Sequence, residues 1–458
     1  MDTGATPQGD ASTAATRTQL HLDRKTNGGK LMNPLDLVLD PVTAPGVIAA
    51  KLWIKGGSSA DPQGQRGVHQ LLGSLLTRGC GPYDHLALAD LVEGCGAGLR
   101  CDTHEDGMLI SLKCADRDAE RLLSLLGWML IDPHLDPNQV KLERELSLQA
   151  LQRQREDPFH LAFDGWRNMA YGNGPYGHDP LGFSEDLKQL GREQLFSLVD
   201  RLSANSPVLA LAGNLPADLE QSLGSMESFQ RWSDKPTPPA MKSDSGTTSS
   251  QNALSKTNLS LQNEPTAQVV MMLGQPSLSH GHEDDLALRL LNCHLGLGMS
   301  SLLFRRLREE HGVAYDVGIH HPVREGAAPF VLHASTSEEK AQLTLQLLLE
   351  CWWELSQQPL SEEDMALARA KFHGQLAHGA QTTGQRAERR AQLRVLGLPA
   401  NYDKHSLEEI KNLDGISLQK AAQRHLQTPM LSLCGPGASL QNLAKDWQQQ
   451  AVKPYLIA

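Results

Sequence analysis

Several features that would assign this 458-residue chain to a common class are absent from its sequence. No apolar run reaches the roughly 18 residues that a membrane-spanning helix needs. The seven cysteines are odd in number and form no C-x-x-C pair, which favours reduced, buried thiols over a disulfide framework. The 42 basic and 53 acidic side chains lack the basic excess that nucleic acids or anionic membranes require. We therefore expect no nucleic-acid partner, no membrane span and a cytoplasmic location.

Common catalytic signatures are also missing. The Gly-rich run “GNGPYG”, residues 172–177, lacks the Lys-Ser/Thr that completes a phosphate-binding loop. No G-x-S-x-G turn and no Cys/His nucleophile pattern is present. His280 and His282 lie in the polar stretch “SHGHEDD”, where we expect solvated side chains and not a metal site. His320 and His321 are adjacent on an expected strand, so they would point to opposite faces.

The composition divides the chain at one place. Residues 231–258 are rich in Ser, Thr, Pro and Lys, which indicates a linker. Residues 1–28 are mostly small and polar and lack the apolar core of a secretory signal, so we expect a disordered tail. Two segments of similar size remain, 29–230 and 259–458, and each is long enough to form a domain.

These two segments resemble each other. “LGREQLFSLVDRLSANSPVLALAGNLP” in the first aligns with “LDGISLQKAAQRHLQTPMLSLCGPG” in the second, and both predict a helix before a short strand that stops at Gly213 or Gly435. Each segment also begins with strand patterns and continues with a helix, two more strands and long helices. This order is typical of α+β proteins. We expect two homologous α+β domains, each a mostly antiparallel sheet covered by helices.

One helical pattern has the spacing of a metal site without its ligands. In “GSSADPQGQRGVHQLLGSLL”, residues 57–76, His69 is followed four positions later by Gly73. Positions i and i+4 of a helix can supply two zinc ligands, but glycine has no side chain. Leu72 stands where a Glu would serve as general base, and it accepts no proton. A lone His in this pattern is typical of a packed, hydrogen-bonded side chain, so the residues predict no metal here.

The wider stretch resembles the insulinase/pitrilysin family of zinc peptidases. “NPLDLVLDPVTAPGVIAAKLWIKGGSSADPQGQRGVHQLL”, residues 33–72, is similar to the family's opening strands and its G-x-x-H-x-x-E-H motif. The family's third zinc ligand is a Glu on a later helix, similar to “KLERELSLQALQRQ”, where this chain has Gln149 or Ala150. Of the family's four catalytic positions only His69 is retained. The resemblance therefore implies a degenerate zinc motif.

A second segment resembles the family more closely. “GLGMSSLLFRRLREEHGVAYDV”, residues 296–317, is similar to the family segment in which an Arg and a Tyr seven positions apart contact substrate. The resemblance assigns these roles to Arg308 and Tyr315, whose donors suit carbonyl oxygens and developing negative charge. From the residues alone, Arg308 would be a solvated charge and Tyr315 a core aromatic. Gly296 and Gly298 fit either a plain turn between helices or a flexible substrate-contacting loop.

The family forms clamshells of such domains, and some members divide the clamshell between two chains. This chain is similar to the non-catalytic member, which would be half of the clamshell. The resemblance implies a heterodimer with a homologous zinc-bearing subunit, peptide substrates, and zinc bound by the partner and not by this chain. It also implies that this chain is inactive alone. Two alternatives stay open: a non-proteolytic structural or assembly subunit, as in the respiratory bc1 complex, and a peptide-binding homodimer.

Overall fold

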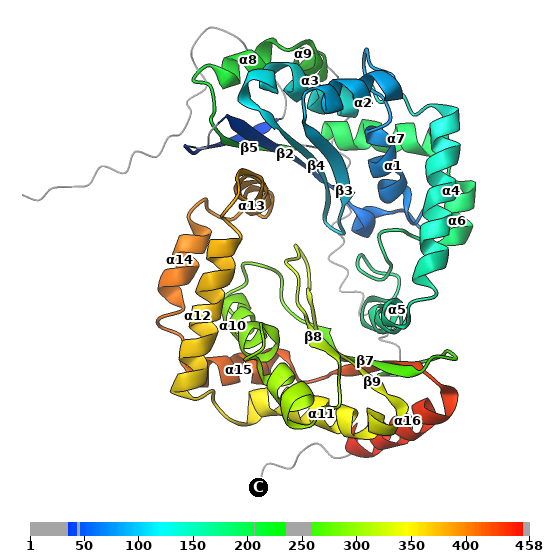
Figure 1. The fold of residues 1–458 in the computed structure, drawn as a ribbon, viewed down its shortest axis with the longest axis vertical. Coiled ribbons are helices and arrows are strands. Elements are labelled where there is room, and N and C mark those ends of the chain that lie inside the picture. Colours follow the sequence, from blue (N-terminus) through cyan, green and yellow to red (C-terminus); the bar gives the residue numbers. More distant parts are fainter. Residues whose placement is uncertain (1–34, 44–45, 206, 235–257, 452–458) are drawn as a thin grey trace, which may run out of the picture.

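The computed structural model describes residues 35–43, 46–205, 207–234 and 258–451. They form two halves, each built on one five-stranded sheet (Figure 1). The tail expected at residues 1–28 lies outside the described residues. Among the described residues, no helix is long and apolar enough to cross a membrane.

The linker expected at residues 231–258 lies mostly outside the described residues. The structure corrects its predicted start, because residues 231–234 are helical. The helix α9 (Glu227–Asp234) continues through residue 231. Trp232 is buried in the core of the first half, and its indole N–H donates to the carbonyl of Ser203 at 2.9 Å. The first half therefore ends later than expected because this side chain belongs to its core.

The two sheets have the same strand order, β1-β5-β2-β4-β3 and β6-β10-β7-β9-β8. The first pair of each sheet, β1 with β5 and β6 with β10, is parallel, and the other neighbours are antiparallel. The prediction of two homologous, mostly antiparallel α+β domains is confirmed. The strands of the first half are β1 (Asp36–Pro41), β2 (Val47–Lys55), β3 (Gly98–Thr103), β4 (Gly107–Ala115) and β5 (Val208–Gly213). Those of the second half are β6 (Leu259–Asn263), β7 (Gln268–Pro276), β8 (Asp316–His320), β9 (Pro329–Ser337) and β10 (Met430–Gly435).

Helices surround both sheets. The remaining helices of the first half are α1 (Val68–Leu76), α2 (His85–Gly94), α3 (Ala119–Ile131), α4 (Pro137–Gln154), α5 (Pro158–Tyr171), α6 (Ser184–Gln189), α7 (Arg192–Ala204) and α8 (Leu219–Ser225). Those of the second half are α10 (Asp285–Gly296), η3 (Phe304–Glu310), α11 (Ala341–Gln357), α12 (Glu362–His378), α13 (Thr383–Val395), α14 (Tyr402–Glu409), α15 (Gly415–His425) and α16 (Gly437–Ala451). Short 3₁₀ turns are η1 (Ser58–Ala60), η2 (Asp116–Asp118) and η4 (Glu338–Lys340).

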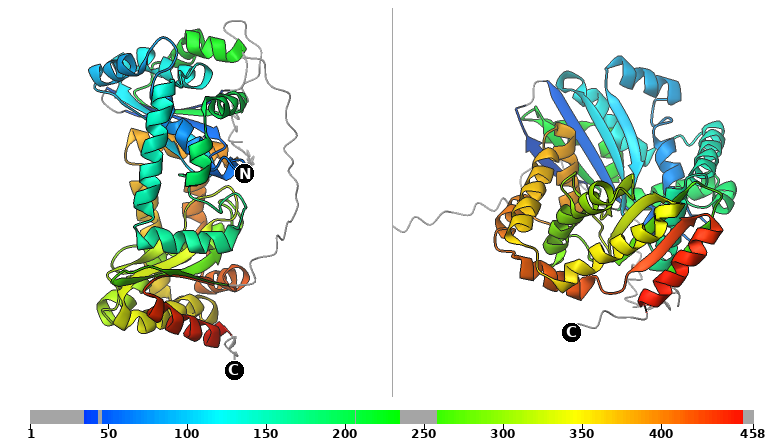
Figure 2. Two further views of the ribbon diagram at one scale, coloured as in Figure 1. Left: turned by 90° about the vertical axis from the view of Figure 1, so that its right-hand side faces the viewer. Right: turned by 60° about the horizontal axis from the view of Figure 1, so that its bottom comes forward.

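The two halves exchange one helix each. α5 of the first half packs on the second sheet, and α13 of the second half packs on the first sheet. Figure 1 shows α13 (orange) on the inner face of the upper sheet and α5 (teal) on that of the lower sheet. The long helices α4 and α12 run along opposite sides of the molecule and lead the chain to these positions (Figures 1 and 2).

Each exchanged helix buries apolar side chains against its host sheet. Trp166 of α5 is fully buried, and its indole donates to the carbonyl of Gly274 on β7 at 3.0 Å. Ala387 and Ala391 of α13 are buried against the first sheet, where Trp53 joins the contact. Both faces of each sheet are therefore covered, one by helices of its own half and the other by a helix of the opposite half.

Polar contacts reinforce the exchange. The Nζ of buried Lys51 on β2 lies 2.7 Å from a carboxylate oxygen of Glu388 on α13. At the tip of the β3–β4 hairpin, Glu105 pairs with Arg324 of the opposite half at 2.5 Å. Asp106 next to it accepts from the backbone N–H of Glu325, also of the opposite half, at 2.8 Å. These contacts fix the relative position of the halves at several separate places.

Candidate functional site

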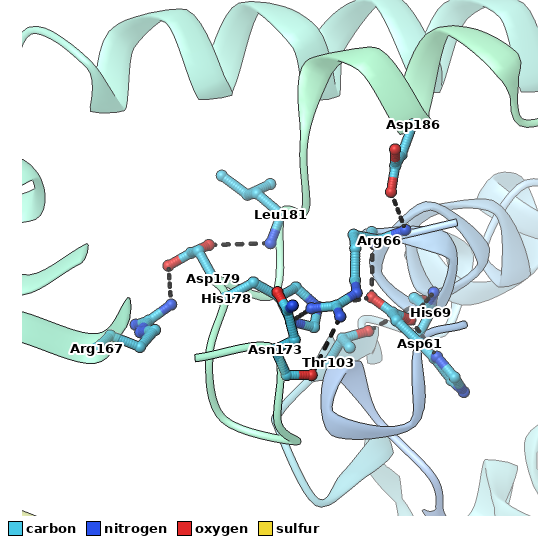
Figure 3. A network of polar contacts seen from close by, with 11 residues as sticks. Asp61, Arg66, His69, Thr103, Arg167, Asn173, His178, Asp179, Leu181 and Asp186 are labelled. Carbon is cyan, nitrogen blue, oxygen red and sulfur yellow. Dashed lines mark hydrogen bonds and ion pairs between the residues drawn. The ribbon is translucent and has the colours of Figure 1, made fainter. Parts of the chain in front are cut away.

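The helix α1 carries the degenerate zinc motif, and its His69 takes part in a buried hydrogen-bond network (Figure 3). The ring of His69 is only 2% exposed, and its Nδ1 lies 2.6 Å from Asp61 Oδ1. Asp61 Oδ2 accepts from the backbone N–H of Gly67 at 2.6 Å and from Nε2 of His178 at 3.1 Å. Arg66 donates to the other ring nitrogen of His178 at 2.8 Å.

The charge on Asp61 is stabilised by these donors. Burial alone would raise the pKa of Asp61, but the hydrogen bonds from His178 and His69 outweigh burial and lower it. The carboxylate also accepts from the backbone at the first turn of α1, where helix N–H groups lack partners within the helix. His69 therefore belongs to a clasp, the Asp61–His69–His178 network, that holds the start of α1.

The other positions of the motif are filled by core packing. Leu72 is 1% exposed and packs in the core of the first half. A Cβ added at Gly73 would lie 2.7 Å from Thr103 Oγ1 and 3.5 Å from Cys101 Sγ, both on β3. Ordinary carbon contacts begin near 3.5 Å, so β3 occupies the space that a second His would need.

The position of the third ligand offers no donor either. Gln149 is exposed and Ala150 is half-buried on α4. Within the described part of the chain, no group of three or more His, Cys, Asp or Glu side chains is arranged to hold a metal ion. Since a catalytic zinc site takes three protein ligands, the residues present at this motif do not fit zinc.

The Arg and Tyr of the second segment lie side by side on the surface. Arg308 is at the end of η3, a π-helical turn, and Tyr315 comes just before β8. Nη1 of Arg308 donates to the backbone carbonyl of Tyr315 at 3.3 Å, and its guanidinium lies 4.9 Å from the ring centre of Phe304. Tyr315 is 78% exposed, so it is not a core aromatic. Both functional groups are therefore free to meet a ligand.

The two glycines ahead of this segment have different constraints. A Cβ added at Gly296 would lie 2.2 Å from a methyl carbon of Ile319, so the end of α10 requires glycine to approach β8. Gly298 has a φ of +77°, in the left-handed region that favours glycine, and nothing lies within contact of an added Cβ. The residues from Gly298 to Ser300 are exposed.

One prediction about histidines is wrong. His280 is not solvated: it is buried, and its Nδ1 lies 3.0 Å from buried Asp285. Burial lowers the pKa of His280 despite the neighbouring carboxylate. His282 is exposed as expected. The polar sequence around His280 suggests exposure, but Asp285, five residues later, pairs with the ring inside the fold.

Comparison with known proteins identifies the family. The profile “Insulinase (Peptidase family M16)” matches residues 44–181, and “Peptidase M16 inactive domain” matches residues 190–372. The chain belongs to the insulinase family of peptidases. The resemblance inferred from the two motifs is thereby confirmed, and the fold agrees with it.

Relatives of this M16 chain cover most of its length. An uncharacterized zinc protease of Bacillus subtilis is 23% identical over 419 residues, covering 89% of this chain and 98% of that protein. One of Rickettsia felis is 22% identical over 364 residues, covering 79% and 85%.

Solved structures share the fold. A peptidase M16 inactive domain from Pseudomonas fluorescens superposes with a TM-score of 0.77 at 20% identity, covering 88% of this chain and 96% of that one. A protease from Helicobacter pylori gives 0.76 at 16% identity, covering 89% and 99%. A chain of complex III2 from Candida albicans gives 0.70 at 12% identity, covering 87% and 93%.

Proposed function

We propose that this M16 chain is the non-catalytic, substrate-binding subunit of a two-chain zinc peptidase that acts on unfolded or short peptides. Its partner would be a homologous subunit with an intact zinc motif, and Arg308 and Tyr315 would complete that partner's site. One observation carries the proposal: Arg308 and Tyr315 are adjacent and exposed, whereas the zinc motif of the same chain is filled by Leu72, Thr103 and the His69 clasp.

The proposed role follows from the donors that this pair offers. Arg308 donates one hydrogen bond to the Tyr315 carbonyl, and the other donors of its planar fork remain for a ligand. The phenol of Tyr315 adds an O–H beside them. Two donors on one surface can hold a peptide carbonyl and favour the negative charge that develops on its oxygen during hydrolysis. Zinc would belong to the partner, since the residues of this chain do not fit it.

The first experiment is a native purification of this chain from its own cells, with zinc content and cleavage of a quenched peptide measured on the eluted material. A similar-sized homologue with an intact H-x-x-E-H motif, zinc and peptidase activity would support the proposal. Elution with unrelated membrane or assembly partners and no activity would favour the structural subunit. Self-association with peptide affinity and no zinc would favour the peptide-binding homodimer.

Substitution of the pair separates a peptidase subunit from a scaffold. In the reconstituted complex, we expect Arg308→Ala and Tyr315→Phe each to lower kcat/KM by about 10²-fold, as loss of one transition-state donor does. Both variants should still co-elute with the partner. Arg201→Ala, an exposed arginine on α7, is the matched control and should leave turnover unchanged. Full activity in both pair variants would refute the proposed role.

A further inference from the structure

The second half contains a cavity of about 220 Å³ that the proposed function does not use. It lies between α10, α12, α13 and the β8–β9 loop, residues 321–328. Neither Arg308 nor Tyr315 lines it. Its charged and polar lining includes His280, Asp285, Arg289, His321, Gln375 and Arg389. Asp285, Arg289 and the amide of Asn292 follow one face of α10 at positions i, i+4 and i+7.

Arg289 lines this cavity and has no hydrogen-bond or ion-pair partner among the described residues. Its Nη1 is completely buried and makes no hydrogen bond, and within the described residues its guanidinium forms no ion pair. The guanidinium lies 4.7 Å from the ring centre of Phe372 on α12, which fixes its plane without satisfying its donors. A buried donor left without an acceptor loses its hydrogen bonds to water on folding, and the cost is larger when the donor is charged.

The carboxylates near Arg289 already have other partners. Asp285 accepts from His280 at 3.0 Å and from the backbone of Gly281 at 3.3 Å. Asp403 accepts from Arg389 at 2.5 Å and 2.9 Å. Both carboxylates interact electrostatically with Arg289 and offset part of its positive potential, but neither hydrogen-bonds to it. Among the described residues, the guanidinium of Arg289 therefore has no hydrogen-bonded acceptor.

A second unpartnered cation lies at the same α10–α12 contact. Nζ of Lys371 is buried and has no hydrogen-bond partner among the described residues. Burial raises the pKa of the Cys293 thiol to about 11, and the positive charges of Arg289 and Lys371 oppose this rise. Gln375, which lines the cavity, lies 4.0 Å from the same sulfur. Lys371 thus adds positive potential behind the cavity, which Asp364 offsets in part.

From this arrangement we infer that the cavity is a binding site for a small oxyanion, a carboxylate or phosphate that accepts hydrogen bonds from the guanidinium of Arg289. Planar guanidinium groups pair with such anions through two parallel hydrogen bonds. The amide of Asn292 and that of Gln375 flank the position and can orient the ligand. The inference does not depend on the proposed peptidase role, because the site is contained in this chain.

The volume limits the ligand. Pockets for drug-sized molecules enclose about 300–1,000 Å³, so this smaller cavity fits an anionic group with at most a short side chain. Two sources supply that chemistry: free phosphate, and the carboxylate end of a short peptide or amino acid. They differ in a way that can be tested, because amidation removes the charge of a carboxylate.

The test is titration calorimetry on the full chain in a chloride buffer of constant ionic strength. The probes are inorganic phosphate, glycylglycine and glycylglycine amide. Binding of phosphate alone would identify a phosphate-type site, and binding of glycylglycine but not its amide would identify a carboxylate site. Either result supports the inference. Absence of binding by phosphate and by glycylglycine would overturn it.

Substitutions of Arg289 test whether the binding measured by calorimetry depends on this side chain. We expect Arg289→Gln to weaken binding by about tenfold or more, since a charge-assisted pair is lost. Arg289→Lys keeps the charge but not the fork, so its affinity should be intermediate, and it serves if Arg289→Gln does not fold. Arg153→Gln, an exposed arginine on α4, is the control and should bind like the wild type. Equal affinity in the wild type and either Arg289 variant would overturn the assignment.

Discussion

Asp61 accepts hydrogen bonds from the rings of His69 and His178 and from two backbone N–H groups at the start of α1, those of Gly67 and His69. The residue that a zinc peptidase would use as a ligand is thereby held as part of the scaffold. Its former partner position, Gly73, has no room for a side chain because Thr103 lies against it. At the scale of single residues, placing Glu at position 72 and His at position 73 would therefore not restore a metal site.

A double substitution, Leu72→Glu with Gly73→His, tests this reasoning. We expect no stoichiometric zinc, because the third ligand is still missing, and a loss of about 1–3 kcal/mol in the free energy of unfolding from overpacking. Metal analysis by mass spectrometry and urea unfolding measure the two effects. Gly94→Ala is the control: an added Cβ meets no atom at that position in α2, so stability should be unchanged or slightly higher. Zinc uptake with unchanged stability would contradict the prediction.

At the scale of elements, the strands could be predicted from the sequence but the exchanged helices could not. Alternating or continuous apolar runs correspond to β2, β4, β7 and β9 because a sheet imposes its period on each strand locally. α13 instead carries four arginines among its 13 residues, a composition typical of an exposed helix, although it buries two alanines together with Leu393 and Val395. Three of its arginines pair with Asp36 and Asp40, carboxylates about 350 residues earlier in the chain.

The candidate site divides in the same way. The spacing of Arg308 and Tyr315 is visible in the sequence, but the exposure of both is set by how η3 and β8 meet in space. The burial of His280 depends on Asp285 and on Arg389 of α13, which lies 3.5 Å from its Nε2. Motif spacing is therefore predictable, whereas partners supplied by distant elements are not.

The contact between α5 and the second sheet should depend on pH. His320 on β8 packs edge-on against Phe163 of α5, and burial, together with Arg324 and Arg167, lowers its pKa from 6.5 to about 4. Below about pH 6.5 His320 is protonated in the unfolded chain, whereas in the folded chain it stays neutral until the pH falls to about 4. Stability therefore falls as the pH is lowered through this range, by roughly 3 kcal/mol from this group.

Urea unfolding between pH 7 and pH 4 measures this effect. His320→Phe keeps an aromatic ring against Phe163 but cannot titrate, so its stability should fall less over the same range. His333 also has a pKa lowered by burial and remains in both proteins, so the difference between them isolates His320. Identical pH profiles for the two proteins would show that His320 does not make this contribution.

At the scale of the whole molecule, the exchange of α5 and α13 should keep the halves together without a covalent link. A protease site introduced within residues 235–257 and cut after purification should give two fragments that co-elute in native buffer and separate in urea. Ala387→Glu with Ala391→Glu places carboxylates in the contact of α13 with the first sheet, where both alanines are buried. We expect these fragments to separate on native size-exclusion chromatography. Separation of the unmodified fragments in native buffer would disprove the prediction.

The exchanged helices also determine where such a molecule can move. Two domains can open about a hinge, but here each half places one helix across the inner face of the other half's sheet. Opening would separate Trp166 from β7 and expose the alanines of α13 to water, so we expect the two halves to move as one rigid unit. In the proposed two-chain peptidase, a peptide would then enter between this chain and its partner, and the association of the two molecules would control its entry.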